Sequence, residues 1–444
     1  MSSAVAVGEH LEENPAHTTR PEYLQSTIFF GLLGLLLLGP LAFGAVESWA
    51  IFILEAGSIA LFVLWAIRQA VSDELQLMRS NAFAPMLAFG ALISFQLAFG
   101  QTAYSAATIS TVLLYGGYAL LSFLGVQSLQ RSWQWSKLLA GFSLYGFVLA
   151  TFALIQGLTS NGKLYWLRTP RVGGWIYGPY VNHNHYAGLM EMLMPFALVM
   201  FLSPRMRRQH KAMAALAAAM MATTIFICGS RGGMLAFAVQ MAVLVTVLIN
   251  QRNSGKMALA VGAFLLLAFA LLAWLGSREL VARMTSIPVD LRSELSGGTR
   301  LSIDRDCLRM FLQKPITGWG LGVFPEIYPQ FRSFYTNLVI DKVHNDYLQL
   351  LVETGTIGFC VMIWFLLAVC RLAAKKLRVW PSDVKTDVTL AAMLGISGIL
   401  AHSFVDFNLQ IPANAALFFV LCAIAGMKPH SERRHSQHHH TAAA

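Results

Sequence analysis

The chain has 444 residues, of which 56% are hydrophobic and only 12% are charged. Together with a mean hydropathy of +0.58, this composition excludes an ordinary soluble domain and indicates a protein embedded in a membrane. The net charge of +10 is no sign of nucleic-acid binding, because basic loops at one membrane face account for much of it.

Twelve apolar windows are long enough to span a bilayer, which predicts an all-α polytopic membrane protein. They lie near 26–46, 48–68, 82–100, 106–126, 138–158, 185–203, 211–229, 233–250, 256–275, 346–370, 387–406 and 410–427. Lys and Arg concentrate in alternate loops, on the side that the N-terminus would share, so we expect both termini in the cytoplasm. The predicted organisation is a cytoplasmic tail 1–25, a transmembrane domain 26–427 and a cytoplasmic tail 428–444.

Two long loops, 159–184 and 276–345, would then face the outside of the cell. The second is too long for a passive connector, and long loops in compact folds tend to be functional. Within this loop, residues 299–312 are predicted to form an amphipathic helix. Its expected apolar face carries Leu301, Leu308, Phe311 and Leu312.

Residues 343–358 begin as a polar loop and are expected to continue without a break into an apolar helix. Asp346 is the candidate N-cap, and the amides of the first turn would point back toward His344. The positive end of a helix favours a nearby anion and a neutral imidazole. His344 is therefore a candidate general base beside a phosphate. The alternative is an imidazole that merely lies at the membrane edge.

Arg231 lies in a glycine-containing connection, 228–233, between the seventh and eighth predicted spans. Glycines let backbone approach a ligand, and the forked guanidinium fits phosphate oxygens. Phosphate binding by Arg231 is one interpretation of this pattern. The other is a tight helical hairpin whose arginine contacts lipid headgroups.

A second polar run, Asn182-His183-Asn184-His185, follows Arg171 at the outer end of the sixth span. A His-x-His pair can ligate a metal, but no third ligand stands at a telling spacing, so no metal site is predicted. The asparagines are expected to cap the sixth span and to shape a cavity by hydrogen bonding.

Ionisable residues occur inside the predicted spans, where they are costly unless they line a wet cavity or pair with each other. Glu55, Glu191 and Glu353 lie six to eight residues in from the outer end of their spans, about 9–12 Å deep at the helical rise. His402 and Asp406 lie one turn apart. These positions predict an outward-facing cavity ringed by Arg171, Arg231, Arg300 and His344, with chance alignment as the alternative.

The order of these motifs resembles the O-antigen ligase and O-antigen polymerase superfamily of bacterial inner-membrane glycosyltransferases. The resemblance covers about residues 170–412. It rests on Arg171, 182–187, 230–233, Arg300, 315–324, 344–347, 353–355, Gly358 and 402–406. One departure is that Asn-His-Asn-His stands where many ligases have an Asn-Pro-Asn run, which leaves the acceptor open.

The resemblance implies a transferase without a cofactor or metal that acts at the periplasmic face of the inner membrane. Its donor would be a glycan on undecaprenyl pyrophosphate, and its acceptor lipid A-core or another glycan. By similarity, His344 would activate the acceptor, and Arg231, Arg300 and Arg171 would hold the pyrophosphate. Cavity support is expected from Asn182, Asn184, Asn345, Glu191, Glu353, His402 and Asp406.

Within the superfamily the ligase reaction is favoured narrowly over polymerisation, because the His-Asn and Ser-Arg-Gly-Gly motifs look most like the ligase branch. Protein O-oligosaccharyltransfer is less favoured, since we expect no further periplasmic domain after residue 427. A hypothesis of another class is a transporter of polyprenyl-linked glycans, with the intramembrane carboxylates as proton or substrate sites. Against transport, the carboxylates sit high in the spans and no inverted repeat is visible.

Overall fold

The computed structural model describes residues 15–72, 77–170, 176–249, 251, 254–295, 299–336 and 339–428, with the backbone alone for 15–21 and 276–295. The regular elements of this part of the chain are helices, which confirms the all-α prediction. They are α1 (Pro15–Leu41), α2 (Ser48–Val71), α3 (Phe83–Ala98), α4 (Ser105–Ser128), α5 (Ser132–Leu158), α6 (His183–Leu202), α7 (Arg208–Ile227), α8 (Arg231–Ile249), α9 (Ser254–Leu295), α10 (Thr299–Gln313), α11 (Phe324–Ile327), α12 (Asp346–Leu377), α13 (Val384–His402) and α14 (Pro412–Ala425), with 3-10 turns at Phe43–Ala45, Tyr328–Gln330 and Asn408–Gln410.

Within the described residues, ten helices are long and apolar enough to cross a membrane. The third and twelfth predicted spans correspond to α3 and α14, which are shorter apolar helices. The first predicted span ends early, because α1 stops at Leu41 and a tight 3-10 turn with Gly44 at φ +80° follows. Every apolar window in the sequence therefore falls on a helix, although two of these helices are short for a full crossing.

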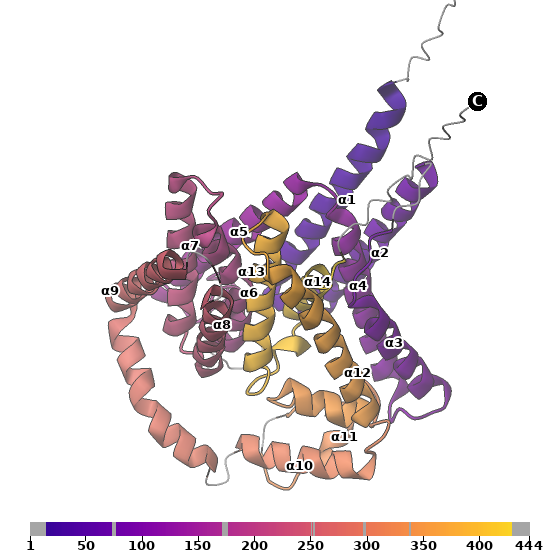
Figure 1. Cartoon of the computed structure of the whole chain (residues 1–444). Helices are drawn as coiled ribbons and strands as arrows, with labels where there is room; N and C mark the ends of the chain where they lie inside the picture. Colours follow the sequence, from indigo (N-terminus) through magenta and orange to yellow (C-terminus); the bar gives the residue numbers. More distant parts are fainter. Residues whose placement is uncertain are drawn as a thin grey trace, which may run out of the picture.

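Helix α6 forms the centre of the bundle (Figure 1). Of the residues in its apolar window, 89% are buried, whereas the buried share is 67% for α13 and 11% for the membrane-length part of α9. A helix that is apolar on all sides is buried when other helices surround it, and α5, α7, α8 and α13 pack around α6. The N-terminal end of this central helix carries the polar run 182–185, of which His185 is buried and the other three residues are half-buried.

At one end of the bundle, α10, α11 and the start of α12 enclose a small second core, and the last part of α9 runs toward α10 (Figure 1). Because α9 continues to Leu295, the first part of the predicted loop 276–345 is helical. Helix α9 therefore extends beyond the apolar window 256–275 that predicted it. The second core includes Ile303, Cys307, Met310, Val323, Phe324, Tyr328, Val343 and Val352.

The amphipathic helix predicted at 299–312 exists as α10, but its expected buried face was wrong. Ile303, Asp306, Cys307 and Met310 are buried, whereas Leu301, Leu308 and Leu312 are exposed and Phe311 is half-buried. The two faces lie on opposite sides of the helix, and both contain apolar residues. Periodicity alone therefore could not decide which face packs against the second core.

Helix α12 is interrupted at Gly355, a feature that the apolar window 346–370 did not predict. Gly355 has φ 64° and ψ −168°, a conformation that favours glycine. Residues 315–320 enter this break: the amide of Thr356 donates to the carbonyl of Pro315 at 2.8 Å, and the amide of Gly320 donates to the carbonyl of Glu353 at 2.9 Å. These bonds satisfy backbone groups that the break releases from the helix.

Candidate active site

The turn between α13 and α14 (residues 403–411, the α13–α14 turn) carries a buried carboxylate, Asp406. Nδ1 of His344 lies 3.6 Å from Oδ1 of Asp406, and Nδ2 of Asn184 donates a hydrogen bond to Oδ2. Because Nδ1 faces the carboxylate, Nε2 of His344 is directed elsewhere, and 33% of this side chain is exposed. His344 thus has the placement of an imidazole that a carboxylate orients for proton transfer.

A second imidazole also approaches Asp406: Nε2 of His185 lies 3.9 Å from Oδ1. The rings of His185 and His344 pack edge-on against Phe407, with centroid distances of 4.7 and 5.0 Å. Burial by itself would raise the pKa of Asp406, but the imidazoles of His344, His185 and His402 lower this pKa below its usual range. Asp406 is therefore ionised near neutral pH and can stabilise a proton that arrives on His344.

Glu191 of α6 and His402 of α13 form a second, deeper pair. Oε1 of Glu191 lies 2.8 Å from Nδ1 of His402, and both side chains are buried. On the other side of the ring, Nε2 of His402 lies 3.5 Å from Oγ of Ser230. Ser230 in turn accepts a hydrogen bond from the amide of Gly233 at 3.1 Å, which caps the start of α8. This chain of contacts fixes the first turn of α8 against α13.

Of the candidate phosphate-binding arginines, Arg300 contacts the α13–α14 turn, and Arg231 precedes Gly232, which packs close to Val405 of that turn. Arg231 is the first residue of α8, where N-terminal amides favour an anion. Nη1 of Arg300, in the first turn of α10, donates to the carbonyl of Val405 at 3.4 Å. Arg171 lies outside the described residues.

The glycines after Arg231 are explained by packing. A Cβ on Gly232 would lie 2.3 Å from Cδ2 of His402 and 2.9 Å from Cγ2 of Val405. A Cβ on Gly233 would lie 3.0 Å from that of Ala187. These glycines therefore allow α8 to approach the α13–α14 turn, and this approach brings Arg231, the residue before them, near the turn.

The N-cap of α12 is Asn345, so the prediction of Asp346 at this position was wrong. Oδ1 of Asn345 accepts from the amides of Tyr347 and Leu348, both at 3.1 Å. Asp346 instead ties α12 to the α13–α14 turn, because its Oδ2 accepts from Oγ of Ser403 at 2.8 Å and from the amide of Leu409 at 3.0 Å. Residues 345 and 346 together hold His344 beside Asp406.

At the start of α6, Asn182 is the N-cap as expected, since its Oδ1 accepts from the amide of Asn184 at 2.9 Å. The side chain of Asn184 thereby remains available for its hydrogen bond to Asp406. The backbone carbonyl of His185 accepts from Nδ2 of Asn414 at 2.9 Å, and Oδ1 of Asn414 accepts from the hydroxyl of Tyr180 at 2.9 Å. The polar run 182–185 is thus joined to the α13–α14 turn through Asp406 and to α14 through Asn414.

Glu353 has partners of its own, separate from the Glu191–His402 pair. Its Oε2 accepts from the amide of Gly322 at 2.9 Å, and its Oε1 accepts from Nε2 of Gln349 at 3.1 Å. Glu353 therefore secures the glycine-containing loop before α11. The sequence placed both carboxylates at one depth, but depth along a helix does not specify the direction in which each side chain points.

Sequence reasoning assigned no role to Ser230 and Ser403, although both lie in the motif segments 230–233 and 402–406, and it did not name Phe407 or Asn414 at all. For Asn414 a signal existed, since an amide within an apolar helix requires a hydrogen-bonding partner. The serines and Phe407 carried no such signal, because their role depends on which helices pack together.

The fold and the site define a polytopic helical membrane protein with an imidazole–carboxylate pair at one end of the bundle, where Arg300 and the start of α8 also approach the α13–α14 turn. Residues 216–363 match the family model described as O-antigen ligase. This match contains Arg231, Arg300 and His344, and it confirms the resemblance to the O-antigen ligase superfamily that the sequence shows. No curated protein matches the chain at a significant level.

Proposed function

We propose that the protein is a metal-independent, inverting glycosyltransferase that moves a glycan from undecaprenyl pyrophosphate to an acceptor hydroxyl. The supporting observation is that His344, Arg300 and the first turn of α8 all approach the α13–α14 turn. An inverting displacement needs a base for the acceptor and positive charge for the leaving diphosphate. Arginine side chains can supply that charge without a metal.

In the proposed reaction, Nε2 of His344 takes the proton of the acceptor hydroxyl. The acceptor oxygen forms a bond to the anomeric carbon as the bond from that carbon to the phosphate oxygen breaks. The electron pair of the broken bond leaves on undecaprenyl pyrophosphate, which Arg231 and Arg300 stabilise, with Arg171 as a third candidate. Asp406 stabilises the imidazolium formed at His344, as carboxylates do in other oriented imidazole pairs.

The proposal includes a location and a topology. The chain would cross the bacterial inner membrane twelve times, with its transmembrane domain at 26–427 and short cytoplasmic tails at 1–25 and 428–444. The loops 159–184 and 276–345 and the site would face the periplasm. The basic residues in alternate loops support this orientation.

Lipid A-core is the acceptor that we propose, so the protein would act as a ligase. The polymerase reaction, in which the acceptor is a second lipid-linked glycan, uses the same donor chemistry and the same base. Mass spectrometry of the product distinguishes them after purified protein is mixed with lipid-linked glycan and each acceptor in turn. A product on neither acceptor, with transport of the intact lipid instead, would contradict the transferase proposal.

The variant that tests the mechanism is His344→Ala in this purified system, with His210→Ala as the matched control because His210 is exposed at the start of α7. We expect His344→Ala to lose transfer by about 10²–10⁴-fold, the usual contribution of a general base, and His210→Ala to retain it.

Arg231→Lys should also lose most activity, because a point charge does not reproduce a forked phosphate contact. Transfer that stops in EDTA would contradict metal independence.

A further inference from the structure

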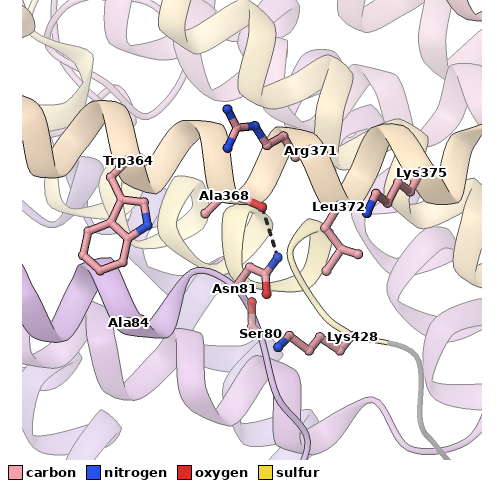
Figure 2. Close-up of a pocket in the computed structure, with 9 residues that line it drawn as sticks. All are labelled: Ser80, Asn81, Ala84, Trp364, Ala368, Arg371, Leu372, Lys375 and Lys428. Carbon is pink, nitrogen blue, oxygen red and sulfur yellow. Dashed lines mark hydrogen bonds between the residues drawn. The ribbon is translucent and has the colours of Figure 1, made fainter.

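A pocket lies at the end of the bundle opposite to His344, between the start of α3, the C-terminal half of α12 and the segment after α14 (Figure 2). Its volume is about 460 Å³, which falls in the range of small-molecule sites, about 300–1,000 Å³. Lys375 lies 20 residues after Gly355 on α12, about 30 Å along the helix. The pocket is thus separate from the candidate active site.

Three cations from two segments line this pocket: Arg371 and Lys375 from α12, and Lys428. All three are exposed, and no side-chain hydrogen bond or ion pair joins them to another residue that the structure describes. Lys376, by contrast, turns toward α14 and donates to the carbonyl of Ala425 at 2.9 Å. The two neighbouring lysines of α12 therefore differ. Lys376 caps the C-terminal end of α14, whereas Lys375 keeps its charge at the pocket.

The floor of the pocket is fixed by hydrogen bonds. Oγ of Ser80 donates to the carbonyl of Ala423 at 2.7 Å, and the backbone amide of Asn81 donates to the carbonyl of Gly426 at 2.8 Å. Nδ2 of Asn81 donates to the carbonyl of Ala368 at 3.4 Å (Figure 2). The amide of Lys428 is also bonded, to the carbonyl of Arg79 at 2.8 Å. The three cations thus border a preformed hollow.

The pocket continues onto an apolar surface. Trp364 lies on its wall and is 47% exposed. Ile363 and Leu367 on α12, and Leu87 on α3, are also exposed. Arg371 and Lys375 occur where the apolar part of α12 ends, so the cations lie at the edge of the apolar surface. Tryptophan is enriched at this level of a bilayer.

From this arrangement we propose that the pocket binds the phosphate headgroup of an anionic glycerophospholipid, with an acyl chain lying along Trp364 and the exposed faces of α3 and α12. Three cations that have no side-chain partner among the described residues match an anionic phosphodiester, and basic pockets between membrane helices bind such headgroups. A pocket of about 460 Å³ is much larger than inorganic phosphate requires. The inference does not depend on the proposed transferase function.

The test uses full-length protein that has been stripped of lipid in detergent, with binding followed by native mass spectrometry. The probes are phosphatidylglycerol, phosphatidylcholine and inorganic phosphate. The variant carries Arg371→Gln, Lys375→Gln and Lys428→Gln. The matched control carries Lys137→Gln, Arg208→Gln and Lys385→Gln, which remove the same charge from exposed residues at this end of the bundle. Thermal unfolding checks that both fold, and the single variant Arg371→Gln serves if the triple variant does not.

We expect the wild type and the control to bind phosphatidylglycerol at least tenfold more tightly than the pocket variant does. Phosphatidylcholine should bind all three alike, and inorganic phosphate should not displace phosphatidylglycerol. Equal phosphatidylglycerol affinity in wild type and pocket variant would overturn the proposal. Displacement by inorganic phosphate at similar concentration would assign the pocket to the free anion and overturn the lipid assignment.

Discussion

Asp406 can be tested apart from His344, because asparagine has nearly the same shape but no charge. In Asp406→Asn, the new amide would donate toward Nδ1 of His344, which lies 3.6 Å from Oδ1 in the wild type. That donor favours the tautomer with its proton on Nε2, so His344 could not accept a proton there. We expect transfer to fall by about 10²–10⁴-fold, as when an imidazole loses its orienting carboxylate.

The rate should be measured as product per minute at saturating donor, beside a thermal unfolding curve. Asp341→Asn is the control, since Asp341 is exposed in the same loop as His344. An Asp406→Asn protein that folds and transfers glycan at the wild-type rate would show that this carboxylate does not orient the base.

Gly232 is a residue for which size alone should matter. In Gly232→Ala, the added methyl group would lie 2.3 Å from Cδ2 of His402, a ring held between Glu191 and Ser230. Because this ring is buried and bonded on both sides, we expect a destabilisation of about 1–3 kcal/mol, typical of overpacking, and reduced transfer. Thermal unfolding measures the first effect and product formation the second.

Gly141→Ala on α5 is the matched control, because no atom lies within 4 Å of the Cβ that it would add. Alanine at such a helical position should be neutral or slightly stabilising. A Gly232→Ala protein as stable as Gly141→Ala would mean that α8 does not need its close approach to α13.

At the scale of elements, apolar windows located the helices because a long apolar run has few other stable states in a bilayer. The windows gave no information about the break at Gly355, which depends on residues 315–320 entering α12 from a distant part of the chain. Asn345 and Asp346 are both good N-cap residues, and the choice between them depends on Ser403 and Leu409. Tertiary partners thus decided the points at which local sequence patterns were ambiguous.

The loop before α11 offers a prediction at this scale. Glu353→Ala would leave the amide of Gly322 without the oxygen that it contacts at 2.9 Å. An unsatisfied buried donor costs about 1–3 kcal/mol, so we expect faster hydrogen exchange in residues 318–324. Exchange followed by mass spectrometry measures this effect, with Glu326→Ala as the control because Glu326 is exposed. Unchanged exchange in this loop would remove Glu353 as its anchor.

For the whole molecule, the sequence contained the candidate residues but not their arrangement. Arg231, Arg300 and His344 come from three segments. Arg300 and His344 approach the α13–α14 turn through their own side chains, and Arg231 is brought near it by the close packing of Gly232, which no local pattern encodes. Residue type indicated the chemistry, because bases and phosphate ligands are drawn from few side chains. Helix packing determined which of these side chains meet.

The proposed orientation places the two ends of the bundle in different compartments, which cysteine labelling in intact cells can test. In a background without the five native cysteines, Asp341→Cys marks the end near His344, and Lys385→Cys marks the opposite end; both positions are exposed. After outer-membrane permeabilisation, a charged maleimide cannot cross the inner membrane, so we expect it to label residue 341 at once. Residue 385 should react only after the inner membrane is also opened. The reverse order would place His344 in the cytoplasm, where a periplasmic transfer reaction could not occur.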